Sequence, residues 1–128
     1  MQWYAASVIE YFEIIDEPNQ DAFEVYENVY LVQAVDGDDA WAKAEEIGRA
    51  HAIPDESLRV GDRPARQVFG GVRKVIEMAP NIRTHTNRRE VSVLEHGVEA
   101  TYNLFVVEGR DRLKALIVGE SVELSYEE

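Results

Sequence analysis

The pattern of apolar and polar positions predicts two strands in the first third of the chain. Residues 3–15 mix aromatic and β-branched side chains, which favours a strand with apolar side chains on both faces. Residues 16–21 form a polar turn. Residues 23–35 alternate, so Tyr26 and Tyr30 share the face opposite Val29. Two strands joined by a short loop predict an antiparallel hairpin.

A helix is predicted over residues 38–52. Asp36 is placed to cap the first free amides, and two further aspartates complement the positive end of the helix dipole. Trp41, Ala44, Ile47 and Gly48 recur at helical spacing, and Pro54 lies just beyond the end. We expect Trp41 to lie in the core, together with Trp3 and Phe69.

The middle of the chain is less regular. Residues 55–65 carry many charges and read as a loop, and residues 66–79 read as a third strand. Gly70 and Gly71 lie inside that strand. Paired glycines there predict a bulge or a close approach to the backbone. A polar loop follows over residues 80–89.

The last third predicts further strands. Residues 91–94 and 98–107 read as two strands around a turn at His96 and Gly97. Residues 110–118 leave helix and strand open as alternatives. Residues 121–126 alternate and suit a final strand.

These elements predict one α+β domain over residues 1–128. We expect an antiparallel sheet of about five or six strands, with the main helix packed on one face and room for a short second helix. Both faces of the first two strands are apolar, so both need cover. A face that the helices leave bare would be a dimer surface or the wall of a ligand groove.

Composition fits a folded protein of the cytoplasm. The chain has 128 residues, 45% of them hydrophobic, and no cysteine, which excludes disulfides and thiolate ligands. No apolar run has the length of a membrane span. His51, His85 and His96 lack metal-site spacing, and no serine lies in a hydrolase motif. We therefore expect no metal, no cofactor and no membrane partner.

Charge is segregated along the chain. Residues 55–90 hold eight Lys or Arg against five Asp or Glu, a net charge of +3. The flanks hold five basic residues against twenty acidic ones, a net charge of −15, so the whole chain carries −12. Such a protein repels nucleic acid and favours basic partners.

The basic residues of the second polar loop form a candidate anion site. Arg83, His85, Arg88 and Arg89 lie within seven residues, and arginine forks bind carboxylate and phosphate well. The alternative, which we favour, is that these arginines pair with the acidic hairpin of residues 10–27.

Three stretches together resemble a known family. The first stretch is Trp3–Ser7. The second combines Glu27–Ala34 with Asp39–Ala44, and the third combines Phe69–Val72 with Gly97–Tyr102. Their order and spacing over residues 3–107 resemble an uncharacterised bacterial family, domain of unknown function 4288. The resemblance supports the α+β fold and implies no catalytic residue.

The function that the sequence favours is a non-catalytic binding module, homodimeric, whose acidic surface meets a basic protein partner. The expected interaction surface comprises Tyr26, Tyr30, Glu10, Glu13, Glu24 and Glu27. The alternative is a small enzyme or ligand-binding domain for an anionic metabolite, with the residues 83–89 holding the anion. The global charge and the lack of aromatics in the basic loop oppose nucleic-acid binding.

Overall fold

Over the described residues, six antiparallel strands form one sheet that two helices flank. The computed structural model describes residues 1–78, 96–120, 122 and 124–126. The order of the strands across the sheet is β3-β4-β1-β2-β5-β6. The predicted α+β class is confirmed. The elements in chain order are β1 (Gln2–Ile14), β2 (Ala22–Ala34), α1 (Gly37–His51), β3 (Ile53–Val60), β4 (Arg63–Glu77), β5 (Glu99–Glu108), α2 (Arg110–Ile117) and β6 (Ser125–Tyr126).

The predicted hairpin and main helix are confirmed. β1 pairs with β2 from Gln2 opposite Ala34 to Tyr11 opposite Val25. Asp36 caps α1 as expected, because its carboxylate accepts a hydrogen bond of 2.8 Å from the amide of Asp39. The open choice for residues 110–118 is settled as a helix, α2.

The bulge expected at the paired glycines is confirmed. Ile9 lies opposite Gly71 and Glu10 opposite Phe69, so Gly70 has no partner in β1. The backbone is also closely approached there. An added Cβ at Gly70 would lie 3.2 Å from the Cδ1 atom of Ile117, so α2 packs directly on this stretch.

Three details of the predicted fold are wrong. Residues 55–65 are not a loop, because most of them belong to β3 and to the turn into β4. Of the described residues in the expected final strand, Ser125 and Tyr126 pair with β5, whereas Val122 and Leu124 lie outside β6. Trp41 is 40% exposed, because the stripe of α1 that meets the sheet consists of Ala40, Ala44 and Gly48. The strand expected at residues 91–94 lies outside the described residues.

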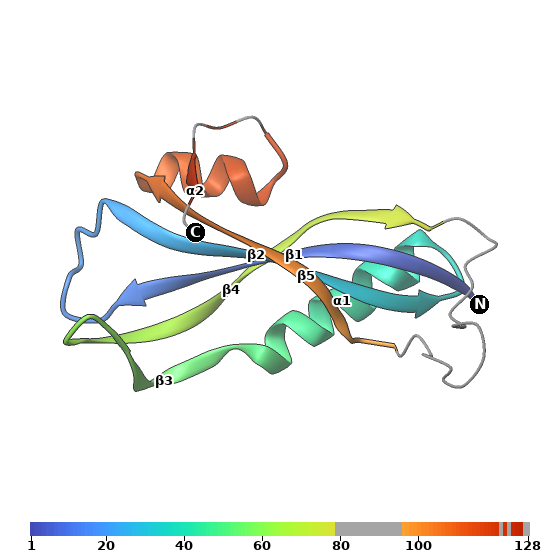
Figure 1. Ribbon diagram of the computed structural model, residues 1–128, viewed down its shortest axis with the longest axis horizontal. Coiled ribbons are helices and arrows are strands. Elements are labelled where there is room, and N and C mark those ends of the chain that lie inside the picture. Colours follow the sequence, from blue (N-terminus) through green and yellow to red (C-terminus); the bar gives the residue numbers. More distant parts are fainter. Residues whose placement is uncertain (79–95, 121, 123, 127–128) are drawn as a thin grey trace, which may run out of the picture.

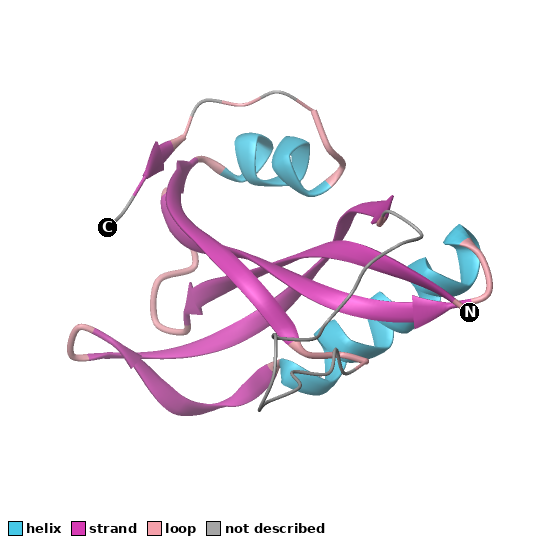
Figure 2. Ribbon diagram, turned by 45° about the vertical axis from the view of Figure 1, so that its right-hand side comes forward, coloured by secondary structure: helices cyan, strands magenta, loops and turns pink. Residues whose placement is uncertain are grey.

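The two helices cover opposite faces of the sheet and different stretches of its strands. In Figure 1, α2 lies above the sheet and α1 below it, and Figure 2 shows how strongly the sheet twists. Each helix covers its own apolar cluster. The cluster under α1 is Tyr4, Ala6, Val8, Tyr30, Val32, Ala34, Ala40, Ala44 and Val72, whereas the one under α2 is Ile9, Phe23, Val25, Phe105, Val107, Leu113 and Leu116.

Among the described residues, this staggered cover leaves part of the face under α1 without a helix. The helix packs over the β1 positions Tyr4, Ala6 and Val8, and it ends at His51. The next β1 positions on the same face are Glu10 and Phe12, because strand side chains alternate between faces. In the described part of the chain, no helix is long and apolar enough to cross a membrane.

Candidate functional site

A pocket of about 590 Å³ lies on the sheet face that packs against α1, where the helix ends. This size is ordinary for a small-ligand site. The pocket draws on four strands, on the end of α1 and on the turn before β5. Its lining residues are Glu10, Phe12, Tyr26, Asn28, Tyr30, His51, Gln67, Gly97, Glu99 and Tyr102.

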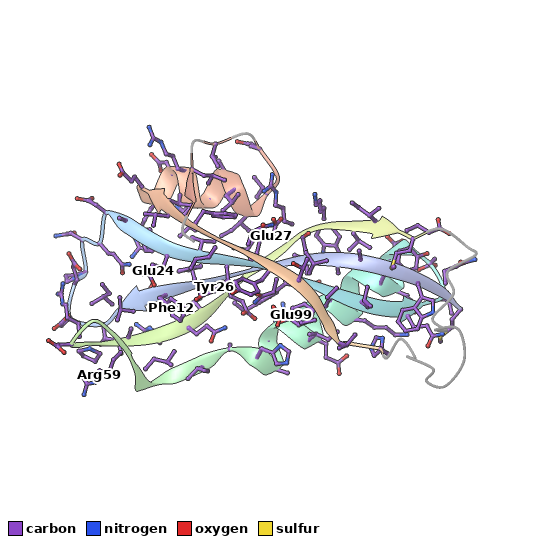
Figure 3. All side chains as sticks on the ribbon, viewed as in Figure 1. Phe12, Glu24, Tyr26, Glu27, Arg59 and Glu99 are labelled. Atoms are coloured by element: carbon purple, nitrogen blue, oxygen red, sulfur yellow. The ribbon has the colours of Figure 1, made fainter. Side chains whose placement is uncertain are left out.

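Strand register brings these side chains together. Glu10 of β1 lies opposite Tyr26 of β2. Across the next pair of strands, Asn28 lies opposite Tyr102, and Tyr30 lies opposite Glu99. Directly opposed residues point to the same face, so one patch of sheet collects these groups. Figure 3 labels Tyr26 and Glu99 of this patch.

Glu10 is the buried acid of the pocket, with 2% of its surface exposed. Its Oε2 atom accepts hydrogen bonds from Asn28 Nδ2 at 2.7 Å and from Gln67 Nε2 at 2.6 Å. Its Oε1 atom is buried and has no hydrogen-bond partner among the described residues. A buried polar atom without a partner is uncommon and calls for an explanation.

Burial raises the pKa of Glu10. The hydrogen bond from Gln67 and the charge of His51 oppose this rise, whereas the charge of Glu99 adds to it. Desolvation disfavours the charged form of a carboxyl group, and here it outweighs the amide donors. The site therefore holds a carboxyl group that gains from any further donor or positive charge.

Tyr30 and His51 form a hydrogen-bonded pair at the edge of the pocket. The Tyr30 hydroxyl lies 2.8 Å from His51 Nδ1, and the tautomer of the imidazole decides which of the two donates. Burial raises the pKa of Tyr30 far above its ordinary value, and the charges of Glu10 and Glu99 raise it further. Tyr30 therefore stays protonated, which makes it a hydrogen-bonding group and a poor nucleophile.

Three aromatic rings extend from the acid across the sheet. The centroids of Phe12 and Tyr26 are 5.7 Å apart, with their planes at 88°. Those of Tyr26 and Tyr102 are 5.8 Å apart, with their planes at 50°. Tyr102 is 58% exposed, so this run of rings ends at solvent.

The pocket favours positive charge. Its lining includes two carboxyl groups, Glu10 and Glu99, and no lysine or arginine occurs among the described lining residues. His51 is its one basic group within that lining. An anion would therefore be repelled here, whereas a cation would find a carboxylate and aromatic rings.

The six residues expected to form an interaction surface do not share one surface. Glu10, Tyr30 and Glu27 are buried, at 2%, 3% and 9% exposed, whereas Glu24 is exposed and Tyr26 is half-buried. Alternation places Glu13 and Glu27 on the face of α2, opposite Glu10. Figure 3 labels Glu27 toward that helix. Whether Glu24 and Tyr26 meet a partner stays a prediction.

Arginines of β4 pair with the acidic hairpin. Arg63 contacts Asp16 at 2.8 Å and Glu17 at 2.9 Å, and Arg66 contacts Glu13 at 2.9 Å. These pairs are partly exposed, so each contributes little to stability. They nevertheless neutralise part of the acidic surface that was predicted to meet a basic partner.

The predicted anion site lies outside the described residues. This applies to Arg83, His85, Arg88 and Arg89, and the choice between anion binding and internal pairing stays open. Of the other histidines, His96 accepts a hydrogen bond of 2.9 Å from the amide of Gln33 through its Nδ1 atom. No group of three or more His, Asp or Glu side chains is arranged to hold a metal within the described part of the chain.

Sequence reasoning found part of the pocket and missed the rest. It singled out Glu10, Tyr26 and Tyr30 as parts of an interaction surface, and it left a bare sheet face open as a dimer surface or the wall of a ligand groove. It gave no place in a pocket to a larger set, namely Phe12, Asn28, His51, Gln67, Glu99 and Tyr102. One signal was present, because Glu10 lies between Val8 and Phe12 on its strand face and Asn28 lies between Tyr26 and Tyr30 on its own.

A second hollow, of about 500 Å³, lies where α2 begins. Gln20 is its buried polar side chain. Its amide nitrogen donates to two backbone carbonyls, and its amide oxygen accepts from the amide of Ile14 at 2.8 Å. Gln20 is thus fully used in holding the hairpin loop. The pocket beside α1 is the better candidate because Glu10 still has an unused oxygen.

Comparison with protein families places the chain. A family model described as a domain of unknown function (DUF4288) matches residues 3–87. The chain belongs to this family. The match covers the pocket residues of β1, β2, α1 and β4, whereas Gly97, Glu99 and Tyr102 lie beyond it. No curated protein and no solved structure matches the DUF4288 chain.

Proposed function

We propose that this protein is a non-catalytic binding module that takes a positively charged side chain of a basic protein partner into the pocket beside α1. The observation that carries the proposal is Glu10, whose buried Oε1 atom has no hydrogen-bond partner among the described residues. A buried acceptor of this kind costs free energy until a donor reaches it. A cation that donates to Glu10 would recover that cost.

The charge of the surroundings supports the same ligand class. Glu99 adds a second carboxyl group at the rim, and the aromatic run from Phe12 to Tyr102 offers ring faces for a cation. The formal charge of −12 would attract a basic partner from a distance and speed its encounter.

A binding role fits these groups better than catalysis does. Tyr30 is held as a neutral phenol by its raised pKa. Glu10 is tied by two amide donors through one oxygen, which fixes its position. Fixed, buried hydrogen-bonding groups suit recognition, because little order is lost when a ligand arrives.

The test is a chemical-shift titration of the ¹⁵N-labelled protein with a short peptide of alternating lysine, arginine and glycine. We expect the largest shifts at Glu10, Asn28 and Glu99, and weaker binding as salt rises. A matched peptide with glutamate in place of the basic residues should cause none. Shifts confined to exposed acids such as Glu24 and Glu108 would overturn the proposal.

The proposal also places the protein in the cytoplasm as a homodimer. The apolar side chains left at the surface support self-association, Val35 at 64% and Ile76 at 53% exposed. Sedimentation velocity should then give twice the chain mass of 14.6 kDa. A single species at 14.6 kDa would contradict the dimer and would leave the proposed role of the pocket unchanged.

A further inference from the structure

The pocket combines features that distinguish one kind of cation from another. A lysine ammonium, a methylated ammonium and an arginine guanidinium differ in shape, in hydration and in the number of N–H donors. The groups that line the pocket respond to these same properties of the cation. They therefore allow the proposed ligand class to be narrowed.

The acid end of the pocket requires an N–H donor. Oε1 of Glu10 lacks a partner within the described chain, while Oε2 already accepts two amide hydrogen bonds. A quaternary ammonium has no hydrogen to donate and would leave Oε1 unsatisfied. The ligand must therefore carry at least one N–H group that points at Glu10.

The aromatic end favours a flat cation. Phe12, Tyr26 and Tyr102 come from three neighbouring strands and form an unbroken run of ring contacts. A planar guanidinium stacks on such rings and is more weakly hydrated than an ammonium, so it loses less on leaving water. A compact ammonium keeps its water more strongly and gains less from the rings.

The position of the second carboxyl group completes the pattern. Glu99 lies opposite Tyr30 in the register of β2 and β5, and its charge acts on both Glu10 and Tyr30. Two carboxyl groups beside a ring face match a guanidinium, which donates from several edges within its own plane. An ammonium has only three donors, and they do not lie in a plane.

From this combination we infer that the pocket is a receptor for the guanidinium group of an arginine side chain. The inference rests on the proposed function and narrows it to one residue type. Glu10 Oε1 accepts an N–H from the guanidinium, Glu99 neutralises its charge at the rim, and Tyr102 covers its face. The same chemistry admits free arginine or arginine within a partner protein.

The test compares small probes that differ at one group. N-acetyl-arginine methylamide, its lysine counterpart and its citrulline counterpart are titrated into the ¹⁵N-labelled full chain. Citrulline has nearly the shape of arginine without its charge. We expect the arginine probe to bind about fivefold more tightly than the lysine probe, and citrulline to bind more weakly than either. The shifts should centre on Glu10 and Tyr102.

Variants then locate the preference. Tyr102→Leu keeps an apolar side chain and removes the ring, and Tyr102 is exposed enough for the fold to tolerate the change. We expect it to bring arginine and lysine affinities to within about twofold of each other. Trp41→Leu, which alters a partly exposed aromatic outside the pocket, is the matched control and should preserve the preference.

Each outcome decides between the claims. Equal or tighter binding of lysine overturns the guanidinium inference and leaves the cation-binding function standing. Equal binding of citrulline overturns it as well, because charge would then play no part. If the arginine probe fails while the basic peptide binds, the inference falls alone, and if both fail the proposed function falls with it. Tighter binding of an arginine peptide than of free arginine identifies a protein as the source.

Discussion

At the scale of the residue, Glu10 links stability to pH. Burial raises its pKa, so the folded protein keeps the Glu10 proton at pH values where the unfolded chain has lost it. The folded state then binds more protons than the unfolded state. Stability contributed by this group is therefore full below the unfolded pKa and falls as pH rises toward the folded pKa.

Glu10→Gln should remove this pH dependence. A glutamine oxygen still accepts from Asn28 and Gln67, and no charge has to be buried. We expect the free energy of unfolding of the variant to increase relative to that of the wild type as pH rises. At pH values above the folded pKa of Glu10 the difference should reach about 1 kcal/mol. Urea unfolding at several pH values measures this difference. Glu24→Gln, an exposed change on β2, should leave the wild-type profile as it is. Parallel profiles for wild type and Glu10→Gln would contradict this account.

At the scale of the element, α1 depends on a close approach to the sheet. A Cβ added at Gly48 would overlap the Phe69 ring and lie 2.9 Å from Cγ1 of Val8. Gly48→Ala gains helix propensity but forces the helix away from the sheet. We expect a net loss of about 1–2 kcal/mol in urea unfolding.

Gly37→Ala is the matched control for this change. Gly37 lies at the start of the same helix, and no heavy atom lies within 4 Å of an added Cβ. The control should be neutral or slightly stabilising. Equal losses at both positions would mean that the contact with Phe69 does not limit the packing of α1.

The start of α1 depends on its cap. The Asp36 carboxylate accepts from the Asp39 amide at 2.8 Å, and Asp39 in turn accepts from the amide of Val35 at 3.0 Å. Asp36→Ala should cost about 1 kcal/mol of unfolding free energy. Asp38→Ala also removes one negative charge from the first turn but leaves the capping hydrogen bond in place. It should therefore cost less than half as much unfolding free energy. Equal losses of unfolding free energy in the two variants would mean that Asp36 acts through its charge alone and not through the capping hydrogen bond.

The same elements show how far the sequence leads. The β1–β2 hairpin and α1 were predictable because their signals are local, namely alternation, a cap and helical spacing. β3 was not, because the charged residues over 55–65, together with Gly61 and Pro64, suggest a loop, and only pairing with β4 makes the segment a strand. Trp41 was misplaced because it adjoins the buried stripe of α1 without belonging to it.

The pocket could not be predicted as a whole. Its parts lie on four strands and one helix end, and their meeting depends on register across β1, β2, β4 and β5. A bulge at Gly70 shifts that register beside Glu10, and its effect on neighbouring side chains follows from pairing that is far apart in sequence. Local patterns carry no such information.

At the scale of the whole molecule, the placement of the two helices creates the site. α1 and α2 cover opposite faces over different stretches of the strands, so in the part of the chain that the structure describes each face has a covered part and a part without a helix. The chain carries a net charge of −12, and the described lining of the pocket contains two carboxyl groups, Glu10 and Glu99. Attraction at a distance and recognition at contact thus favour the same kind of partner.

The most direct test of this account is the affinity of one basic peptide for three proteins, measured by calorimetry. These are the wild type, Glu10→Gln in the pocket and Glu108→Gln on the exposed end of β5. The measurement is made above the folded pKa of Glu10, where both variants remove one negative charge and only the position differs. We predict that Glu10→Gln weakens binding about tenfold, since it removes a charge-assisted hydrogen bond, while Glu108→Gln stays within about twofold. Equal effects of the two variants, or none from Glu10→Gln, would contradict the claim that this pocket binds the partner.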